Sequence, residues 1–246
     1  LDEAEAAGRE YGVEIIRGCE LGVQGQYGEI HLLGLWLPRH SAPLDAELAR
    51  LRGHRQERNL KILDRLRSIG INIGYQEVLD EAGGESVGRP HIARVLQKRG
   101  VVSNFAQAFE LYLGYYGAAY VPRTLLTPEE GVSLMADLGA VVSFAHPMLI
   151  RCPPSWFDEI IPRLKEAGLG AIEAYHSEHS ARDERFCVEL AARYGLGLSG
   201  GSDYHGMAKP GVELGRGKGG LRVTVALLDA LKARRKRPVD DAPEVL

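Results

Sequence analysis

Cysteine is scarce in this sequence, and its distribution argues against several classes of protein. The three cysteines, Cys19, Cys152 and Cys187, lie far apart among 246 residues. An odd number at such wide spacing argues against a disulfide framework and against a cysteine-based zinc site. We therefore expect a reducing, cytoplasmic location. The sequence also lacks any apolar run near the roughly 18 residues needed to cross a bilayer, so we expect no membrane partner.

An excess of one charge and several common enzyme motifs are missing as well. The 30 Lys and Arg residues nearly balance the 33 Asp and Glu residues, and the net charge of −3 argues against a globally basic nucleic-acid binder. The chain has no Walker loop, no G-x-G-x-x-G after a strand and no G-x-S-x-G elbow. What is present is a globular composition, 45% hydrophobic, in a chain long enough for a sizeable core.

Apolar patterning predicts strands that alternate with helices. The expected strands lie at 13–17, 29–36, 140–145, 170–174 and 196–199, and the expected helices at 1–11, 127–138, 155–167 and 179–194. Short apolar strands separated by helices are typical of a parallel α/β sheet with both faces buried. Residues 39–120 break the pattern, because leucines at helical spacing predict a long helix there, with shorter ones at 90–99 and 103–112 and no strand.

The clearest chemical signal follows the last expected strand, in the segment Ser199–Gly206. Asp203 and His205 are two residues apart, so in an extended chain they share a face. His146 similarly ends the strand at 140–145, directly before Pro147. Carboxylate and imidazole groups at the carboxyl ends of α/β strands suit manganese, iron or zinc. Taken alone, each of these residues is explained as well by a capping role or by a hydrogen-bonded core histidine.

Two further residues belong to this pattern. Glu20 follows the strand at 13–17, where a carboxylate would be costly to bury unless it is paired or bound to a metal. His31 lies inside the strand at 29–36, and by itself is more simply a hydrogen-bonded core residue. Together the candidates offer three imidazoles and two carboxylates near strands, and we expect them to be metal ligands: Glu20, His31, His146, Asp203 and His205.

Other residues are candidates for contact with an anionic substrate. Arg89 and His91 open a helix within 39–120, where backbone N–H groups favour a phosphate. His176 and His179 follow the strand at 170–174 and would touch a phosphate or a leaving group, unless they merely cap the next helix. Lys209, which follows the Ser199–Gly206 segment, would also face the site. Ordinary helix starts and a solvated lysine explain the same residues without a substrate.

As a set these motifs are specific. They are Gly18-Cys19-Glu20, Ile30-His31-Leu32-Leu33-Gly34, Gly88-Arg89-Pro90-His91-Ile92-Ala93, Ala145-His146-Pro147, Glu173-Ala174-Tyr175-His176-Ser177 and Gly200-Gly201-Ser202-Asp203-Tyr204-His205-Gly206. Over nearly the whole chain, they resemble the PHP (polymerase and histidinol phosphatase) family of metal-dependent phosphoesterases. Their order and spacing are most similar to its nucleoside 3′,5′-bisphosphate phosphatases and 5′→3′ exoribonucleases.

The resemblance implies an α/β fold, a distorted (β/α)₇ PHP-type barrel formed by 1–38 and 121–236. A helical insertion at 39–120 would cover the substrate, and 237–246 would be a tail. The resemblance also implies up to three divalent ions, manganese first, with Zn²⁺, Fe²⁺ or Mg²⁺ as alternatives. Five residues match the family's metal ligands, namely Glu20, His31, His146, Asp203 and His205, while Arg89 and His91 match positions near the substrate phosphate.

The amino-terminal motifs of the family are missing. Its members open with a strand ending in D-x-H-x-H-S and continue with a T-D-H-D motif, and neither occurs here. The chain instead starts at Leu1 with an acidic, helix-like segment that has no signal-peptide features. We therefore expect an N-terminally truncated barrel without its first strands, which by itself would be inactive because ligands are absent.

These features predict a metal-dependent phosphatase or phosphoesterase that acts on nucleotide 3′,5′-bisphosphates and on the 5′ ends of short RNA, with no obligate protein partner. The ions would activate a water for in-line attack on phosphorus. Arg89 would hold a phosphate, with His91, His179 and Lys209 as further substrate contacts, and either His91 or His176 would protonate the leaving group. The alternatives are a phosphatase of a small phosphomonoester such as histidinol phosphate, and a non-catalytic binding module that uses the basic helix at 50–67.

Overall fold

The computed structural model describes residues 1–84, 87–206 and 209–235, and its chain divides into two compact units. One unit, here called the sheet unit, consists of Leu1–Leu44 and Leu126–Leu246. The other, here called the helical unit, is Asp45–Leu125. The expected tail at 237–246 lies outside the described residues.

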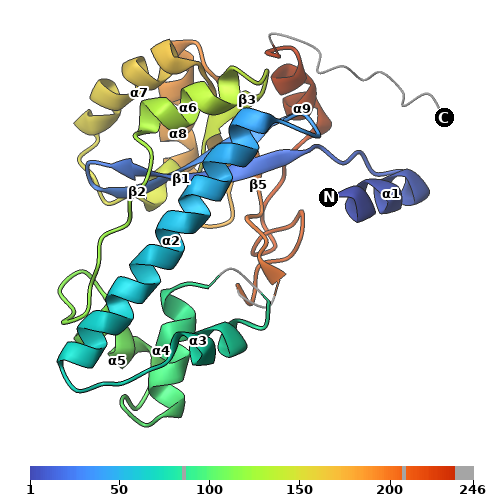
Figure 1. Ribbon diagram of the computed structural model, residues 1–246. Coiled ribbons are helices and arrows are strands. Elements are labelled where there is room, and N and C mark those ends of the chain that lie inside the picture. Colours follow the sequence, from blue (N-terminus) through green and yellow to red (C-terminus); the bar gives the residue numbers. More distant parts are fainter. Residues whose placement is uncertain (85–86, 207–208, 236–246) are drawn as a thin grey trace. The chain divides into compact units, whose positions relative to one another are not determined.

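The sheet unit is built on a mixed β-sheet (Figure 1), in which the described residues form five strands in the order β1-β2-β3-β4-β5. The strands are β1 (Gly18–Gly25), β2 (Gly28–Leu35), β3 (Val141–Phe144), β4 (Leu169–His176) and β5 (Gly197–Gly201). β1, β2 and β3 pair antiparallel, whereas β3, β4 and β5 pair parallel. The carboxyl ends of the three parallel strands therefore meet at one edge of the sheet.

Two expectations about the strands are wrong. Residues 13–17 form no strand, and the first strand is Gly18–Gly25, which contains Glu20 instead of preceding it. Glycines at 18, 22 and 25 weaken the strand signal, but pairing with β2 along its whole length outweighs local propensity. The sheet is also not purely parallel, because the short turn between β1 and β2 permits only an antiparallel hairpin.

Helices cover the sheet and fix the ends of its strands. The sheet unit contains α1 (Asp2–Tyr11), α6 (Pro128–Ala136), α7 (Ser155–Ala167), α8 (Ala181–Tyr194), α9 (Val225–Lys232) and the 3₁₀ turn η2 (Pro147–Leu149). α6 packs on β1, β2 and β3, and α8 packs on β4 and β5. Thr127 and Ser180 cap α6 and α8 through capping boxes, so these two helices begin where the sequence predicts.

The helical unit has its own apolar core. It contains most of α2 (Ala42–Ser68), together with α3 (Tyr75–Ala82), α4 (Arg89–Lys98), α5 (Phe105–Ala108) and the π-helical turn η1 (Phe109–Leu113). Ile62, Ile92 and Leu96 are fully buried within it. The long helix and the two shorter ones match expectation, whereas the eight-residue α3 was not expected. No helix in the described ranges combines the length and apolarity needed to span a membrane.

Candidate functional site

The edge formed by β1, β2 and the end of β3 brings three of the expected ligands together. Gly22 of β1 lies opposite His31 of β2, so Glu20, two residues before Gly22, projects from the same face as His31. His146 follows β3, which pairs with β2, and the hydrogen bond from Ala145 N to His31 O (3.0 Å) holds the chain there. Residues more than 100 positions apart in the sequence thus become neighbours.

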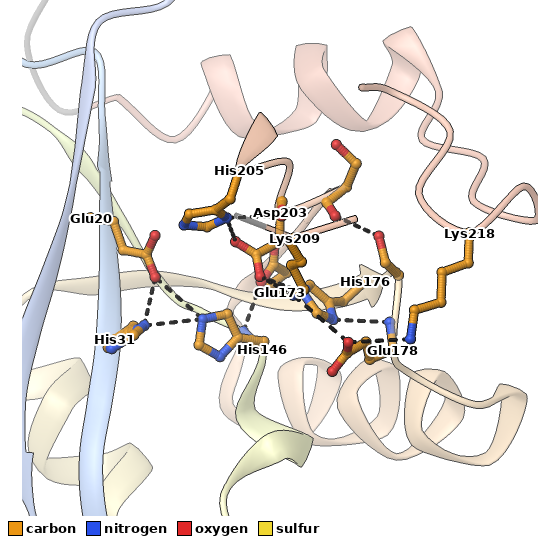
Figure 2. Close-up of polar contacts among 12 residues, drawn as sticks. Glu20, His31, His146, Glu173, His176, Glu178, Asp203, His205, Lys209 and Lys218 are labelled. Atoms are coloured by element: carbon orange, nitrogen blue, oxygen red, sulfur yellow. Dashed lines mark hydrogen bonds and ion pairs between the residues drawn. The ribbon is translucent and has the colours of Figure 1, made fainter. Parts of the chain in front are cut away.

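These three side chains converge on one point (Figure 2). His31 Nδ1 lies 2.6 Å from Glu20 Oε1, and His146 Nε2 lies 3.3 Å from both Glu20 Oε1 and His31 Nδ1. Two imidazole nitrogens and one carboxylate oxygen within 4.8 Å of one another form a donor set that suits a divalent transition metal.

Glu20 also belongs to a second group of possible ligands. Glu20, Asp203 and His205 each offer a ligand atom, and these atoms lie within 4.8 Å of one another. His205 Nδ1 is 3.1 Å from Asp203 Oδ1 (Figure 2). Since one carboxylate is common to both groups, the geometry suits two neighbouring cations that share Glu20 as a ligand.

Backbone strain marks both groups. His146 has φ of 28° and Asp203 has φ of 52°, conformations that are rare for residues with a Cβ atom. Such residues typically cost about 1–3 kcal/mol each and persist where the surrounding structure holds them. Glycine assists at the end of β5, because a Cβ atom on Gly200 would lie 2.7 Å from Tyr175 Cβ.

The charges of this cluster are strongly coupled. Hydrogen bonds from His146 and His31 hold the pKa of Glu20 well below its usual range. Hydrogen bonds to Glu20 and Glu29 raise the pKa of His31 to about 9. In the metal-free chain, the protonated imidazole of His31 therefore neutralises Glu20, and a bound cation would take over this role.

Glu173 is a site residue that the sequence reasoning missed. It is 4% exposed on β4, and its Oε2 accepts a hydrogen bond of 2.7 Å from the backbone N of His146. Burial raises the pKa of Glu173 to about 7. A carboxylate inside the otherwise apolar run Leu169–Tyr175 was the available signal, since burying such a group is costly without a purpose.

His176 and Lys209 both lie against Asp203. The His176 Nδ1 atom accepts from the backbone N of Glu178 (3.1 Å), so its Nε2–H faces Asp203 Oδ2 at 3.4 Å. Burial, with a further contribution from His179, lowers the pKa of His176 to about 4, and its ring is neutral near pH 7. Lys209 Nζ lies 2.6 Å from Asp203 Oδ2, which places a cation beside the possible ligands.

The remaining expected substrate contacts are in different settings. His179 donates from Nδ1 to Ala174 O (2.9 Å), and its buried Nε2 has no hydrogen-bond partner in the described chain. Arg89 and His91 belong to the helical unit, where Arg89 donates to Leu113 O and His91 Nδ1 accepts from Gly88 N. The expected contact of Arg89 and His91 with a phosphate stays a prediction.

A cleft of about 470 Å³ opens beside the cluster within the sheet unit. Its lining includes the polar residues Glu20, His146, Glu173, Asp203 and His205, together with the apolar residues Ile16, Leu33, Leu35, Val223, Leu227, Leu228 and Leu231. Four of the five possible ligands, Glu20, His146, Asp203 and His205, are therefore accessible to a small molecule from this cleft.

Comparison with known proteins places this geometry in context. No family model matches the chain. It is 30% identical to a 5′-3′ exoribonuclease of Haemophilus influenzae over 205 residues, which cover 83% of the chain and 74% of that protein. It is 27% identical to a 3′,5′-nucleoside bisphosphate phosphatase of Chromobacterium violaceum, over 98% of the chain and 85% of that protein. A solved structure from Bifidobacterium adolescentis, described as a metal-dependent phosphoesterase, matches with a TM-score of 0.77 at 27% identity, covering 96% of the chain and 82% of that structure.

Proposed function

The chain belongs to the PHP family of metal-dependent phosphoesterases. On this basis we propose that it hydrolyses nucleotide phosphomonoesters, with 3′,5′-bisphosphates as the foremost substrates. The 5′ ends of short RNA are proposed as further substrates, since related proteins include a 5′-3′ exoribonuclease. One observation carries the proposal. Glu20 joins two groups of ligand-type atoms, one with His31 and His146 and the other with Asp203 and His205.

Mn²⁺ is the proposed resident ion, because the mixture of imidazole and carboxylate donors suits it, with iron and zinc as alternatives. When bound, such ions supply an activated water and offset the charge that develops on phosphoryl oxygens. We also propose that the five-stranded sheet is part of a distorted (β/α)₇ barrel. The parallel pairing of β3, β4 and β5, with helices between them, supports this arrangement.

The residues beside the ligands have distinct proposed roles. Lys209 would donate from Nζ to a phosphate oxygen, because Asp203, a possible metal ligand, holds its ammonium group beside the site. His176 is neutral near pH 7 and directs Nε2–H at Asp203, so a positioning role suits it better than the expected proton donation. Glu173 holds the strained backbone of His146. Arg89 and His91 remain the proposed phosphate contacts of the helical unit, with His91 as candidate proton donor.

Phosphate release from adenosine 3′,5′-bisphosphate by the full-length gene product tests this proposal. Asp203→Asn keeps the size of the side chain but removes its charge, and we expect it to abolish Mn²⁺-dependent release. Asp229→Asn is a matched control, because Asp229 is an exposed residue of α9 outside the cleft lining. Release that survives chelation, or that Asp203→Asn leaves unchanged, would contradict the proposal.

A substrate panel separates the proposed function from its alternatives. Histidinol phosphate hydrolysed faster than the bisphosphate would assign the site to a small non-nucleotide phosphomonoester. Mn²⁺ binding without hydrolysis of any member of the panel would contradict the proposed nucleotide substrate and leave only the metal site.

A further inference from the structure

Two tyrosines of the helical unit stand out from its surface on the turn that follows η1. Tyr116 is 95% exposed and Tyr115 is 71% exposed. Their rings form an edge-to-face pair with centroids 4.9 Å apart, and the ring of Tyr115 also lies 5.3 Å from that of Tyr120. Aromatic rings contribute most when they are buried, so adjacent exposed rings indicate a surface for a partner.

The turn that carries these rings is well fixed. Gly114 N donates to Phe109 O (2.7 Å), and Gly117 N donates to Gly114 O (2.9 Å). Tyr120 N donates in turn to Gly117 O (3.0 Å). Any side chain on Gly117 would collide with the backbone of Tyr112. Because the backbone of the turn is already ordered, the protein would lose little conformational entropy when a ligand docks on the rings.

Guanidinium groups surround the base of the same turn. Arg89 donates to Leu113 O (2.9 Å) on one side of the turn. On the other side, Arg65 donates to Tyr120 O and Arg58 donates to Val121 O. A carbonyl oxygen is neutral, so these hydrogen bonds bring no negative charge to the turn. The turn is thus bordered by cations on both sides.

The helical unit as a whole also carries a net positive charge. Residues 45–125 contain 12 Lys and Arg against 9 Asp and Glu, a net charge of +3, although the whole chain is −3. The remainder of the chain, with 18 basic and 24 acidic residues, therefore carries −6. A polyanion would be attracted to the helical unit and repelled by the rest of the chain.

We propose that Tyr115 and Tyr116 are a stacking surface for the bases of single-stranded RNA. Each base has a flat π face that an exposed aromatic ring can cover without regard to sequence, and arginines beside the rings suit the backbone phosphates. The choice of RNA as the polyanion rests on the proposed function. The stacking surface itself consists of residues that have no part in the metal site.

Binding of a fluorescently labelled, single-stranded RNA of about ten nucleotides tests the stacking surface. Anisotropy is recorded with chelator present, so that the strand is not hydrolysed. Tyr116→Ala should weaken binding about tenfold, and Tyr115→Ala by a similar factor. Tyr116→Phe, which keeps the ring, should bind within about twofold of the unaltered protein. Tyr11→Ala is the matched control, because Tyr11 is 75% exposed in the sheet unit and should not affect binding.

An abasic strand of the same length distinguishes stacking from attraction by charge. It should bind more weakly than the RNA, and Tyr116→Ala should weaken its binding no further. Equal losses on both strands, unchanged binding in Tyr116→Ala, or no RNA binding by the unaltered protein would each overturn the proposal. Self-association that Tyr116→Ala abolishes, with RNA binding unchanged, would assign the surface to a second copy of the chain instead.

These results are independent of hydrolysis. Phosphate release without RNA binding contradicts the stacking surface alone. RNA binding that depends on Tyr116, in a protein that releases no phosphate, contradicts the proposed function alone.

Discussion

In the sheet unit, the candidate ligands come from β1, β2 and the ends of β3 and β5, and they are assembled by strand pairing. In the helical unit, Tyr115 and Tyr116 are sequence neighbours on one turn, held by hydrogen bonds within a dozen residues. The first arrangement is partly buried and strained, which suits cations that must be held in fixed geometry. The second is exposed, which suits a large and variable ligand.

Charge separates the two units as well. The sheet unit carries −6 and the helical unit +3, so the overall value of −3 describes neither. Within α2, Arg50 and Arg67 pair with Glu47 and Asp64. Part of the basic stripe at 50–67 is therefore neutralised by acidic neighbours on the same helix, whereas Arg58 and Arg65 lie at the turn that we propose for contact with RNA.

The largest expected effect concerns the two separate cores. Leu164→Ala in the sheet unit and Leu96→Ala in the helical unit should each lower the free energy of unfolding by about 2–5 kcal/mol, since both side chains are fully buried. Both tryptophans, Trp36 and Trp156, lie in the sheet unit. In urea, we expect Leu164→Ala to shift the fluorescence transition and Leu96→Ala to shift only part of the far-ultraviolet circular dichroism.

The exposed Leu60→Ala serves as the control for these core variants and should change stability by less than about 0.5 kcal/mol. Identical shifts of both signals in both core variants would show that the units unfold as one, and the comparison between them would lose its thermodynamic basis.

The next effect concerns the metal site of the sheet unit. His31→Gln should weaken Mn²⁺ binding at least about hundredfold. Loss of a residue that only supports a metal ligand can already weaken binding by roughly that factor. The reason is that His31 supplies one of the three converging ligand atoms. His40→Gln, at an exposed histidine of the same unit, should bind Mn²⁺ normally in titration calorimetry. Equal affinities in the two variants would remove His31 from the ligand set.

At the same site, the affinity for Mn²⁺ should change about tenfold per pH unit, because binding releases a proton. The pKa of His31 is raised to about 9, so below that pH a proton must leave before Nδ1 can bind a cation. Mn²⁺ affinity should therefore rise with pH up to about 9 and level off above it. Calorimetry in two buffers of different ionisation enthalpy measures the protons released, and the number should be lower by about one in His31→Gln. Binding without proton release would contradict this reading.

The smallest expected effect concerns helix caps in the sheet unit. Thr127→Ala removes the side-chain acceptor of Glu130 N at the start of α6 and should cost about 1 kcal/mol of stability. Thr224→Ala is the control, because the Thr224 side chain makes no capping hydrogen bond to α9. Both are measured by the tryptophan fluorescence transition. A similar loss in the two variants would mean that the cap itself contributes nothing.

Sequence patterns located the parallel part of the sheet better than its antiparallel part. β3, β4 and β5 are short apolar runs followed by ligand-type residues, and each was expected close to its actual position. β1 was misplaced because its glycines hide the strand and an apolar run at 13–17 imitates one. Glu173 was overlooked because its partner, the backbone N of His146, lies 27 residues away and is brought near only by the pairing of β3 with β4.

The sequence by itself determined which residues are able to bind a cation, where most helices begin, and which family the motifs resemble. These properties depend on residue type and on spacing over a few positions. Tertiary structure alone decided that Glu20 belongs to two groups of ligands, that His146 and Asp203 adopt left-handed backbone conformations, and that the pKa values of His31 and Glu173 are raised. The physical reason is that distances and burial in the site arise from pairing between strands that are separated in the sequence, by more than 100 residues for β2 and β3, which no local pattern encodes.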